Sequence, residues 1–116
     1  MIDRCFDYRL IKRLADWPPV ISQTIIYLVD DGVGLWTFHR YRDGLLIHAD
    51  MSDECRGARA IESAKAAFAW IFDNTGTNKI YARIPAENKP ACYMARWSGM
   101  TFIATEDNRR CYEVTP

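Results

Sequence analysis

The stretch MSDECRGARAIESAKAAFAWIFDNTG, residues 51–76, contains the most regular pattern in this chain. Its larger apolar residues recur at steps of three and four, which is the period of an α-helix. The alanines between them also favour helix, and Asn74-Thr75-Gly76 is typical of a helix C-terminus. We therefore predict a long helix that begins beside the segment Arg56-Gly57-Ala58-Arg59-Ala60 and ends near Gly76. The periodic residues are Ile61, Ala64, Phe68, Ile71 and Phe72.

Three strand-like segments precede this helix. They are rich in β-branched and aromatic residues, which are enriched in β-strands. Two turn signals, Asp30-Asp31-Gly32 and Asp43-Gly44, separate them. Tight turns between consecutive strands predict an antiparallel meander. The predicted strands are Val20 to Val29, Val33 to Tyr41 and Leu45 to Met51.

Shorter elements flank these segments. Apolar residues between positions 6 and 16 have helical spacing, and Trp17-Pro18-Pro19 ends that helix because proline cannot continue it. A later helix is expected to begin at Asn88, a good N-cap, and to stop at Gly99. The other predicted elements are a strand at 79–84, this helix over 88–98, and a pair of strands at 101–105 and 110–114.

The predicted order is helix, three strands, helix, strand, helix, two strands. A helix between the third and fourth strands is a crossover, so the sheet should be mixed. We therefore predict one α/β (α+β) domain over residues 1–116.

Composition narrows the function classes. Lys+Arg and Asp+Glu number 15 each, so the net charge is zero, which argues against a general nucleic-acid binder. No stretch approaches the roughly 20 apolar residues of a membrane helix, and the first residues do not resemble a signal peptide. The expected compartment is the cytoplasm. The four separated cysteines are expected to be free thiols, and the two histidines have no clustered partners for a metal.

The start of the long helix is unusually basic. A helix N-terminus carries about half a positive charge, so Arg56 and Arg59 are mildly unfavourable there, and Gly57 is a poor helix residue. One interpretation is an anion site, in which backbone N–H groups and both arginines hold a pyrophosphate. The other is a solvated turn whose arginines pair with Asp53 and Glu54. These residues alone favour the two interpretations about equally.

Two segments resemble motifs of the Gcn5-related N-acetyltransferases (GNAT). Residues 51–61 are similar to the family's pyrophosphate loop, Arg/Gln-x-x-Gly-x-Gly/Ala before a long helix, although Arg59 stands where the family usually has glycine. The Arg59 side chain must then point away from the loop or onto a phosphate. The second motif is Asn-x-x-Ala with a glycine and a bulky residue further on, matched by Asn88, Ala91, Gly99 and Met100. The resemblance covers about residues 44–105 and is to compact, degenerate members, some of them phage-encoded.

The resemblance implies an acyl-CoA N-acyltransferase fold with acetyl-CoA as co-substrate and no metal. The strands before the two motifs would splay apart, and the pantetheine arm would lie in the cleft between them. The residues that the resemblance places at the CoA site are Met51, Arg56, Gly57, Ala58, Arg59, Ala60, Ile61, Asn88 and Ala91.

Candidate catalytic residues are fewer. His48 and Asp50 on the third strand are candidates for the base, and His48 has a suitable intrinsic pKa. A lone strand histidine is nevertheless more often a half-exposed sheet residue, and Asp50 would need a raised pKa. The family's acid is a tyrosine seven positions after the asparagine, where this chain has Ala95. Tyr93 is the candidate acid, but about 160° of helical rotation separates it from position 95. Tyr81 and Arg83 share one face of the next strand and could line the cleft.

The leading hypothesis is an N-acetyltransferase that moves an acetyl group from acetyl-CoA to an unidentified amine. The alternatives are a non-catalytic binding module with the same fold, and a phage virion or host-interaction protein. A homodimer through the terminal strands fits the predicted topology. Fold alone does not identify the acceptor.

Overall fold

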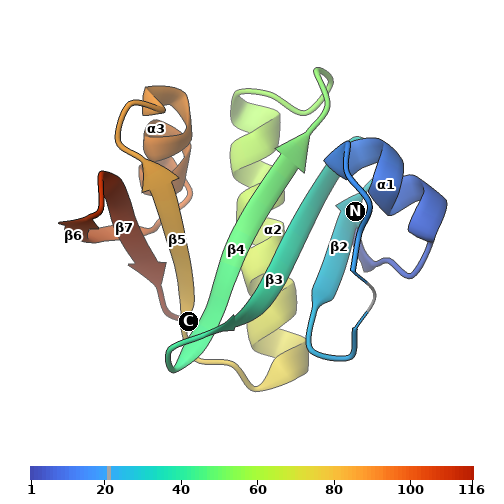
Figure 1. Ribbon diagram of the computed structural model, residues 1–116, viewed down its shortest axis with the longest axis horizontal. Helices are drawn as coiled ribbons and strands as arrows, with labels where there is room; N and C mark the ends of the chain where they lie inside the picture. The colour runs from blue at the N-terminus through green and yellow to red at the C-terminus, as the bar shows by residue number, and fades with distance from the viewer. Residues whose placement is uncertain (21) are drawn as a thin grey trace.

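The computed structural model describes residues 1–20 and 22–116. Its centre is a seven-stranded sheet in the order β1-β2-β3-β4-β5-β7-β6, with helices on both faces (Figure 1). The elements are β1 (Ile2–Arg4), α1 (Tyr8–Ala15), β2 (Ile26–Asp30), β3 (Gly34–Tyr41), β4 (Gly44–Met51), α2 (Ala58–Thr75), β5 (Ile80–Pro85), α3 (Lys89–Trp97), β6 (Thr101–Glu106) and β7 (Arg109–Val114).

Every predicted element is present and in the predicted order, and β1 is additional. It pairs antiparallel with β2, Ile2 lying opposite Asp30. Three residues are too few to show a period, so the sequence analysis missed this strand. Its first predicted strand also began too early, at Val20, because Ser22 Oγ accepts a hydrogen bond from the Thr24 N–H (3.2 Å) and a turn replaces the strand there. Ile21 lies outside the described residues.

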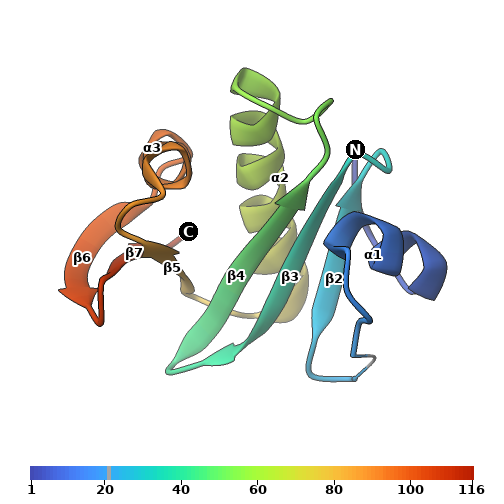
Figure 2. The ribbon, with the colours of Figure 1, turned by 45° about the horizontal axis from the view of Figure 1, so that its top comes forward.

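The two faces of the sheet carry different helices. Alternate β3 residues point to opposite faces, and α2 packs on the face of Trp36 and Phe38 while α1 packs on the face of Leu35. Figure 2 shows α2 and α3 together on one side of the sheet and α1 on the other. We call these the helix face and the front face. The buried Trp36 Nε1–H donates to Ser63 Oγ (2.8 Å), which fixes α2 across the middle of the sheet.

The strands β4 and β5 are parallel, as the crossover predicts, but only two residue pairs join them. These pairs are Leu45 with Ile80 and Leu46 with Tyr81. By contrast, β3 and β4 pair over their full lengths. Past Leu46 the two parallel strands diverge, β4 toward the N-terminus of α2 and β5 toward the N-terminus of α3 (Figure 1).

Gly44 allows the chain to make this junction. Only Arg42 and Asp43 separate β3 from β4, so Gly44 is the first paired residue of β4 rather than part of the turn. A Cβ at position 44 would lie 2.1 Å from the Lys79 carbonyl oxygen, and the Leu45 N–H donates to that same oxygen (3.1 Å). The glycine is therefore required by the close approach of the segment that leads into β5.

We predict that Gly44→Ala destabilises the protein by about 3 kcal/mol, the upper part of the range for forced overpacking, because the clash is with backbone. Gly76→Ala is the matched control. Gly76 has φ +71° but open space around its Cβ position, so its substitution should cost about 1 kcal/mol of backbone strain. Urea unfolding measures both changes. Equal losses of unfolding free energy in the two variants would show that the approach of Lys79 is no constraint.

Candidate functional site

The divergence of β4 and β5 opens a cavity of about 180 Å³ through the sheet. We call it the central cavity. One wall is β4 and the other is β5, while α2 and α3 close it on the helix face. Its lining includes Ile47, His48, Ala49, Ala64, Phe68, Ala82, Arg83, Ile84, Asn88, Ala91, Met94, Ala95 and Ser98.

On the helix face, this cavity continues into a groove of about 470 Å³ between the start of α2 and α3. We call it the outer groove. Ala49, Asn88, Ala91 and Met94 line both spaces, so the two are adjacent. The other residues of the outer groove are Met51, Cys55, Arg56, Gly57, Ala60, Ile61, Pro90, Tyr93 and Trp97.

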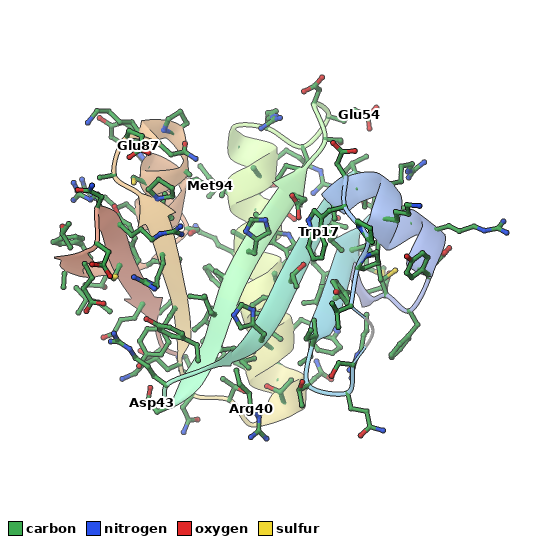
Figure 3. All side chains as sticks on the ribbon, in the orientation of Figure 1. Trp17, Arg40, Asp43, Glu54, Glu87 and Met94 are labelled. Atoms are coloured by element: carbon green, nitrogen blue, oxygen red, sulfur yellow. The ribbon has the colours of Figure 1, made fainter. Side chains whose placement is uncertain are left out.

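On the front face, the central cavity continues into a third space of about 370 Å³, the front pocket. Ile47, His48 and Arg83 line both. The rest of the front pocket is Trp17, Thr37, His39, Leu46 and Arg109. Trp17 lies in front of the sheet, as Figure 3 shows. The three spaces lie next to one another and together reach from the helix face to the front face, and we call them the passage.

The N-terminus of α2, which we call the mouth of this helix, has the properties of an anion site. Gly57 is the N-cap with φ 58° and ψ −131°, a conformation that favours glycine. No side chain caps this helix and its first turn holds no acidic residue, so the first backbone N–H groups are left for another partner. Arg56 stands beside them, exposed, with a long contact of 3.5 Å to the exposed Asp53. Exposed pairs of this kind are weak, so Arg56 remains available to a ligand.

Arg59 has a different role. Its guanidinium points away from the outer groove to Asp30 on β2, where Nη2 donates to Oδ1 (3.0 Å). Asp30 is 2% exposed, and its hydrogen bonds from Arg59 hold its pKa far below the usual range. The same arginine reaches Asp31 (3.4 Å). Of the two orientations that the sequence allowed, the structure has the one in which Arg59 ties the start of α2 to β2.

His48 lies where the central cavity meets the front pocket. Its Nε2 is 3.4 Å from Oδ2 of Asp50. The two residues point to the same face of β4 because they are two positions apart. The carboxylate of Asp50 raises the pKa of His48 above its ordinary value of 6.5. Asp50 therefore favours the protonated form of His48, which lines both spaces together with Ile47 and Arg83.

Tyr93 lies outside the central cavity. It is 59% exposed and lines the outer groove, whereas Ala95 faces the central cavity. This is the separation that helical rotation predicts for two positions. One turn further along the same groove is Trp97, 70% exposed. This pair was not predicted from the sequence, although two aromatic residues four apart on a short helix are visible there.

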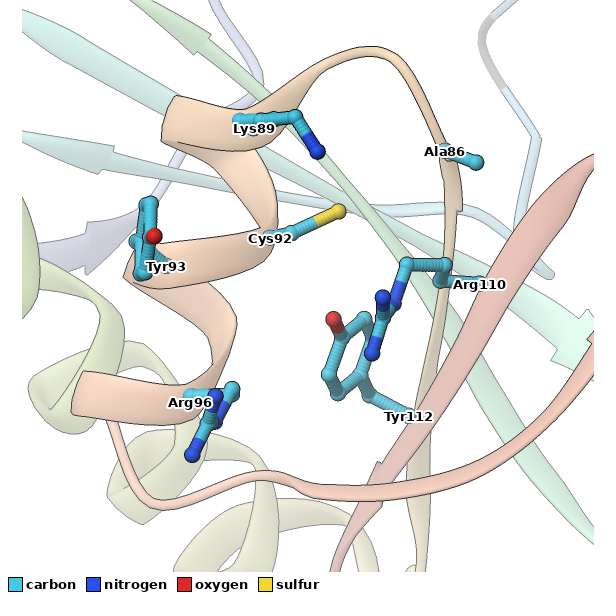
Figure 4. A pocket seen from close by; sticks show the side chains of 7 residues that line it. All are labelled: Ala86, Lys89, Cys92, Tyr93, Arg96, Arg110 and Tyr112. Carbon is cyan, nitrogen blue, oxygen red and sulfur yellow. The ribbon is translucent and has the colours of Figure 1, made fainter.

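A fourth cavity, of about 110 Å³, lies on the other flank of α3. Figure 4 shows Lys89, Arg96 and Arg110 around the side chains of Cys92 and Tyr112. It shares no lining residue with the central cavity. Arg110 stacks on Phe102 with its Cζ 4.6 Å from the ring centroid, and burial raises the pKa of Tyr112. This cavity shares Tyr93 with the outer groove and no lining residue with the front pocket.

Neither a metal site nor a membrane-spanning helix is present among the residues that the structure describes. Residues 1–20 and 22–116 hold no group of three or more His, Cys, Asp or Glu side chains that could bind a metal ion. In the same residues no helix combines the length and the apolar character needed to cross a membrane. All four cysteines are buried and free.

Solved structures of N-acetyltransferases share this fold. A variant of spermidine N-acetyltransferase SpeG from Vibrio cholerae matches over 99% of this chain and 92% of its own, with TM-score 0.79 and 14% identity. N-acetyltransferase PseH from Campylobacter jejuni, in complex with acetyl coenzyme A, matches over 92% of this chain and 75% of its own, with TM-score 0.69 and 12% identity. No protein-family model and no curated protein matches the sequence. The chain has the acyl-CoA N-acyltransferase fold of the GNAT proteins, as the resemblance implied.

We predict that Asp30→Asn destabilises the protein by about 1–3 kcal/mol, less than a fully buried ion pair would, since the Arg59 side chain is 36% exposed. The pKa of Asp30 is lower in the folded protein, so its contribution is fully present above the unfolded value of about 3.9 and is lost as the pH falls from there through the folded pKa. The gap between wild type and variant should therefore narrow at pH 3.

The matched control for this experiment is Asp53→Asn, which removes an exposed carboxylate from Arg56 and should leave the unfolding midpoint unchanged. Denaturant unfolding at pH 7 and pH 3 measures all three proteins. A loss in Asp30→Asn that persists undiminished at pH 3 would contradict the ion-pair account.

Proposed function

We propose that this protein is an acetyl-CoA-dependent N-acetyltransferase that acts on an amine. The observation that carries the proposal is the passage between β4 and β5, which runs from the uncapped N-terminus of α2 to His48. A thioester that enters from the helix face and an amine that enters from the front face would meet at the central cavity. The likeness to SpeG and PseH supports the fold on which this reading depends.

The donor would be held mainly by backbone. Its pyrophosphate lies against the free N–H groups of the first turn of α2, over Gly57, Ala58 and Ala60, with the Arg56 guanidinium beside it. Arg59 contributes only its main chain, because Asp30 occupies its side chain. Met51 and Ile61 supply apolar walls of the groove.

The pantetheine arm would run past Asn88 and Ala91 into the central cavity, since both line the groove and the cavity. Asn88 Oδ1 already accepts a hydrogen bond from the Ala91 N–H (3.3 Å) as the N-cap of α3. Its Nδ2 is then the part of the side chain left to donate to an amide carbonyl of the arm. Tyr93 and Trp97 form an exposed aromatic surface on which the adenine would stack.

The reaction forms one bond and breaks one. The amine nitrogen attacks the thioester carbonyl carbon, the C–S bond breaks, and the products are an N-acetyl amide and the CoA thiol. His48 takes the proton that the amine loses, and a water molecule would relay this proton from the imidazolium to the sulfur, which restores neutral His48. Tyr93 has no part in this scheme, because it lies in the outer groove. Asp50 holds the charge of the imidazolium that forms.

A second candidate function is an acetyl-CoA-binding module without turnover. The observation that favours it is Ala95, which faces the central cavity at the position where the family has its tyrosine acid. The two functions differ in a single readout. Release of CoA thiol in the presence of amines identifies an enzyme, whereas saturable binding without release identifies a binding module.

The surface of the last hairpin is compatible with a homodimer through the terminal strands. β6 is an edge of the sheet, and Phe102 and Ile103 on it are 43% and 44% exposed. Exposed apolar residues on an unpaired edge are a common site of association.

Arg56→Glu should weaken acetyl-CoA binding about tenfold or more, the loss expected for a charge-assisted contact to phosphate. A glutamate near a helix N-terminus is favourable, so the fold should survive. Arg96→Glu, on the other flank of α3, makes the same charge change away from the passage and should bind normally. Calorimetry measures both. Unchanged affinity in Arg56→Glu would remove the helix mouth from the donor site, and no binding at millimolar acetyl-CoA would remove the acetyltransferase.

The rate should depend on pH through His48. A base must be neutral to accept a proton, and the pKa of His48 is raised by Asp50, so kcat/KM should rise with pH through a value above 6.5. Asp50→Asn removes the cause and should move this limb to lower pH. His48→Gln should lower kcat by about 10²–10⁴-fold. A pH profile with the same limb in Asp50→Asn would exclude His48 as the group that titrates.

A further inference from the structure

The front pocket brings two arginines to one face of the sheet. In the antiparallel pair of β5 and β7, Arg83 lies opposite Cys111 and Pro85 lies opposite Arg109. Residues two apart on a strand, and those opposite them, point to the same face. Arg83 and Arg109 are therefore diagonal neighbours, about 7–8 Å apart at their backbones, within reach of a shared partner.

Neither arginine has a carboxylate partner among the described residues. The lining of the front pocket contains no aspartate or glutamate. Two acids on this face have other partners: Glu106, opposite Arg109, pairs with Arg42 (3.2 Å), and Glu113 pairs with Lys79 (3.7 Å). Asp50 lies beside His48 (3.4 Å). The pocket therefore presents two permanent positive charges and no carboxylate in its lining.

Buried polar atoms in this pocket also lack partners. Nε of Arg83 and Oγ1 of Thr37 are both buried and make no hydrogen bond within the described structure, and Thr37 is 7% exposed. A buried donor without an acceptor is unfavourable, so such atoms in a pocket wall usually have a ligand or water as partner. Guanidinium groups fit carboxylate and phosphate oxygens in particular, because they donate two parallel hydrogen bonds.

We propose that the acceptor is a small amine that also carries a carboxylate or a phosphate, held by Arg83 and Arg109 while its amine faces His48. This inference rests on the proposed function, whose acceptor it describes. A pocket of about 370 Å³ is the size of a small-molecule site. Trp17 supplies an apolar wall for the carbon chain between the two groups. A polyamine is disfavoured, because its second ammonium would lie beside the arginines.

The test uses four probes with similar carbon chains and different second groups. They are β-alanine with a carboxylate, O-phosphoethanolamine with a phosphate, ethanolamine with a neutral hydroxyl, and putrescine with a second ammonium. Binding is measured by calorimetry to the protein alone and to the protein saturated with CoA, which cannot transfer an acetyl group. We expect one anionic probe to bind at least tenfold more tightly than ethanolamine, and putrescine to bind most weakly. The tighter anionic probe identifies carboxylate or phosphate as the preferred group.

Variants assign the preference to the two arginines. Arg83→Gln and Arg109→Gln should each reduce the affinity for the anionic probe about tenfold and leave ethanolamine unchanged. Arg96→Gln makes the same charge change outside the passage and should have no effect. Because Arg109 is exposed, its variant tests the proposal even if Arg83→Gln does not fold.

Three results would overturn the proposal: binding of putrescine or ethanolamine as tight as that of the anionic probes, an anionic preference that survives Arg109→Gln, or no binding of any probe. These failures are distinct from failure of the proposed function. Acetyl-CoA binding with rapid acetylation of putrescine would keep the enzyme and reject the anionic acceptor. Anion binding through the arginines without acetyl-CoA binding would keep the anion site and reject the acetyltransferase.

Discussion

The structure of the candidate site depends on the short pairing between the parallel strands β4 and β5. Two residue pairs hold these parallel strands together, next to a glycine whose missing side chain lets the Lys79 carbonyl approach. Past that junction the facing edges of the strands have no ladder between them. Backbone N–H and C=O groups at such an edge need other partners, and water or a ligand in the central cavity can supply them. The fold thus creates a polar-edged slot in the middle of its own sheet.

The packing on the helix face keeps the slot open. α2 lies across β3 and β4 and is fixed there by the Trp36 to Ser63 hydrogen bond, while α3 begins at Asn88 on the other side of the slot. The two arginines at the start of α2 have different roles. Arg59 joins the helix to the buried Asp30 and so fixes where the helix mouth lies. Arg56 remains exposed beside the free N–H groups. The ligand site therefore needs Arg59 to fix the N-terminus of α2 and, with it, the position of Arg56.

Local patterns predicted much of this arrangement. Periodicity, turn residues and capping involve neighbours in sequence. They predicted the long helix, the order of helices and strands along the chain and the N-cap at Asn88. Helical rotation likewise predicted that Tyr93 and Ala95 face different ways. What the sequence could not show depends on register and on distant partners. Arg59 meets an aspartate 29 positions away, and Arg83 and Arg109 become neighbours only through the pairing of β5 with β7. Gly44 was predicted as a turn residue, but its role comes from the approach of Lys79.

The central claim is that acetyl-CoA occupies the slot between β4 and β5 and the mouth of α2. Amide hydrogen exchange with and without acetyl-CoA tests this most directly, since exchange slows where backbone groups gain partners or lose access to water. The account predicts protection confined to residues 47–51 of β4, residues 57–61 at the start of α2 and the beginning of α3, with β6 unchanged. Protection at Arg96 and Arg110 around the cavity on the other flank of α3, with β4 unaffected, would contradict it.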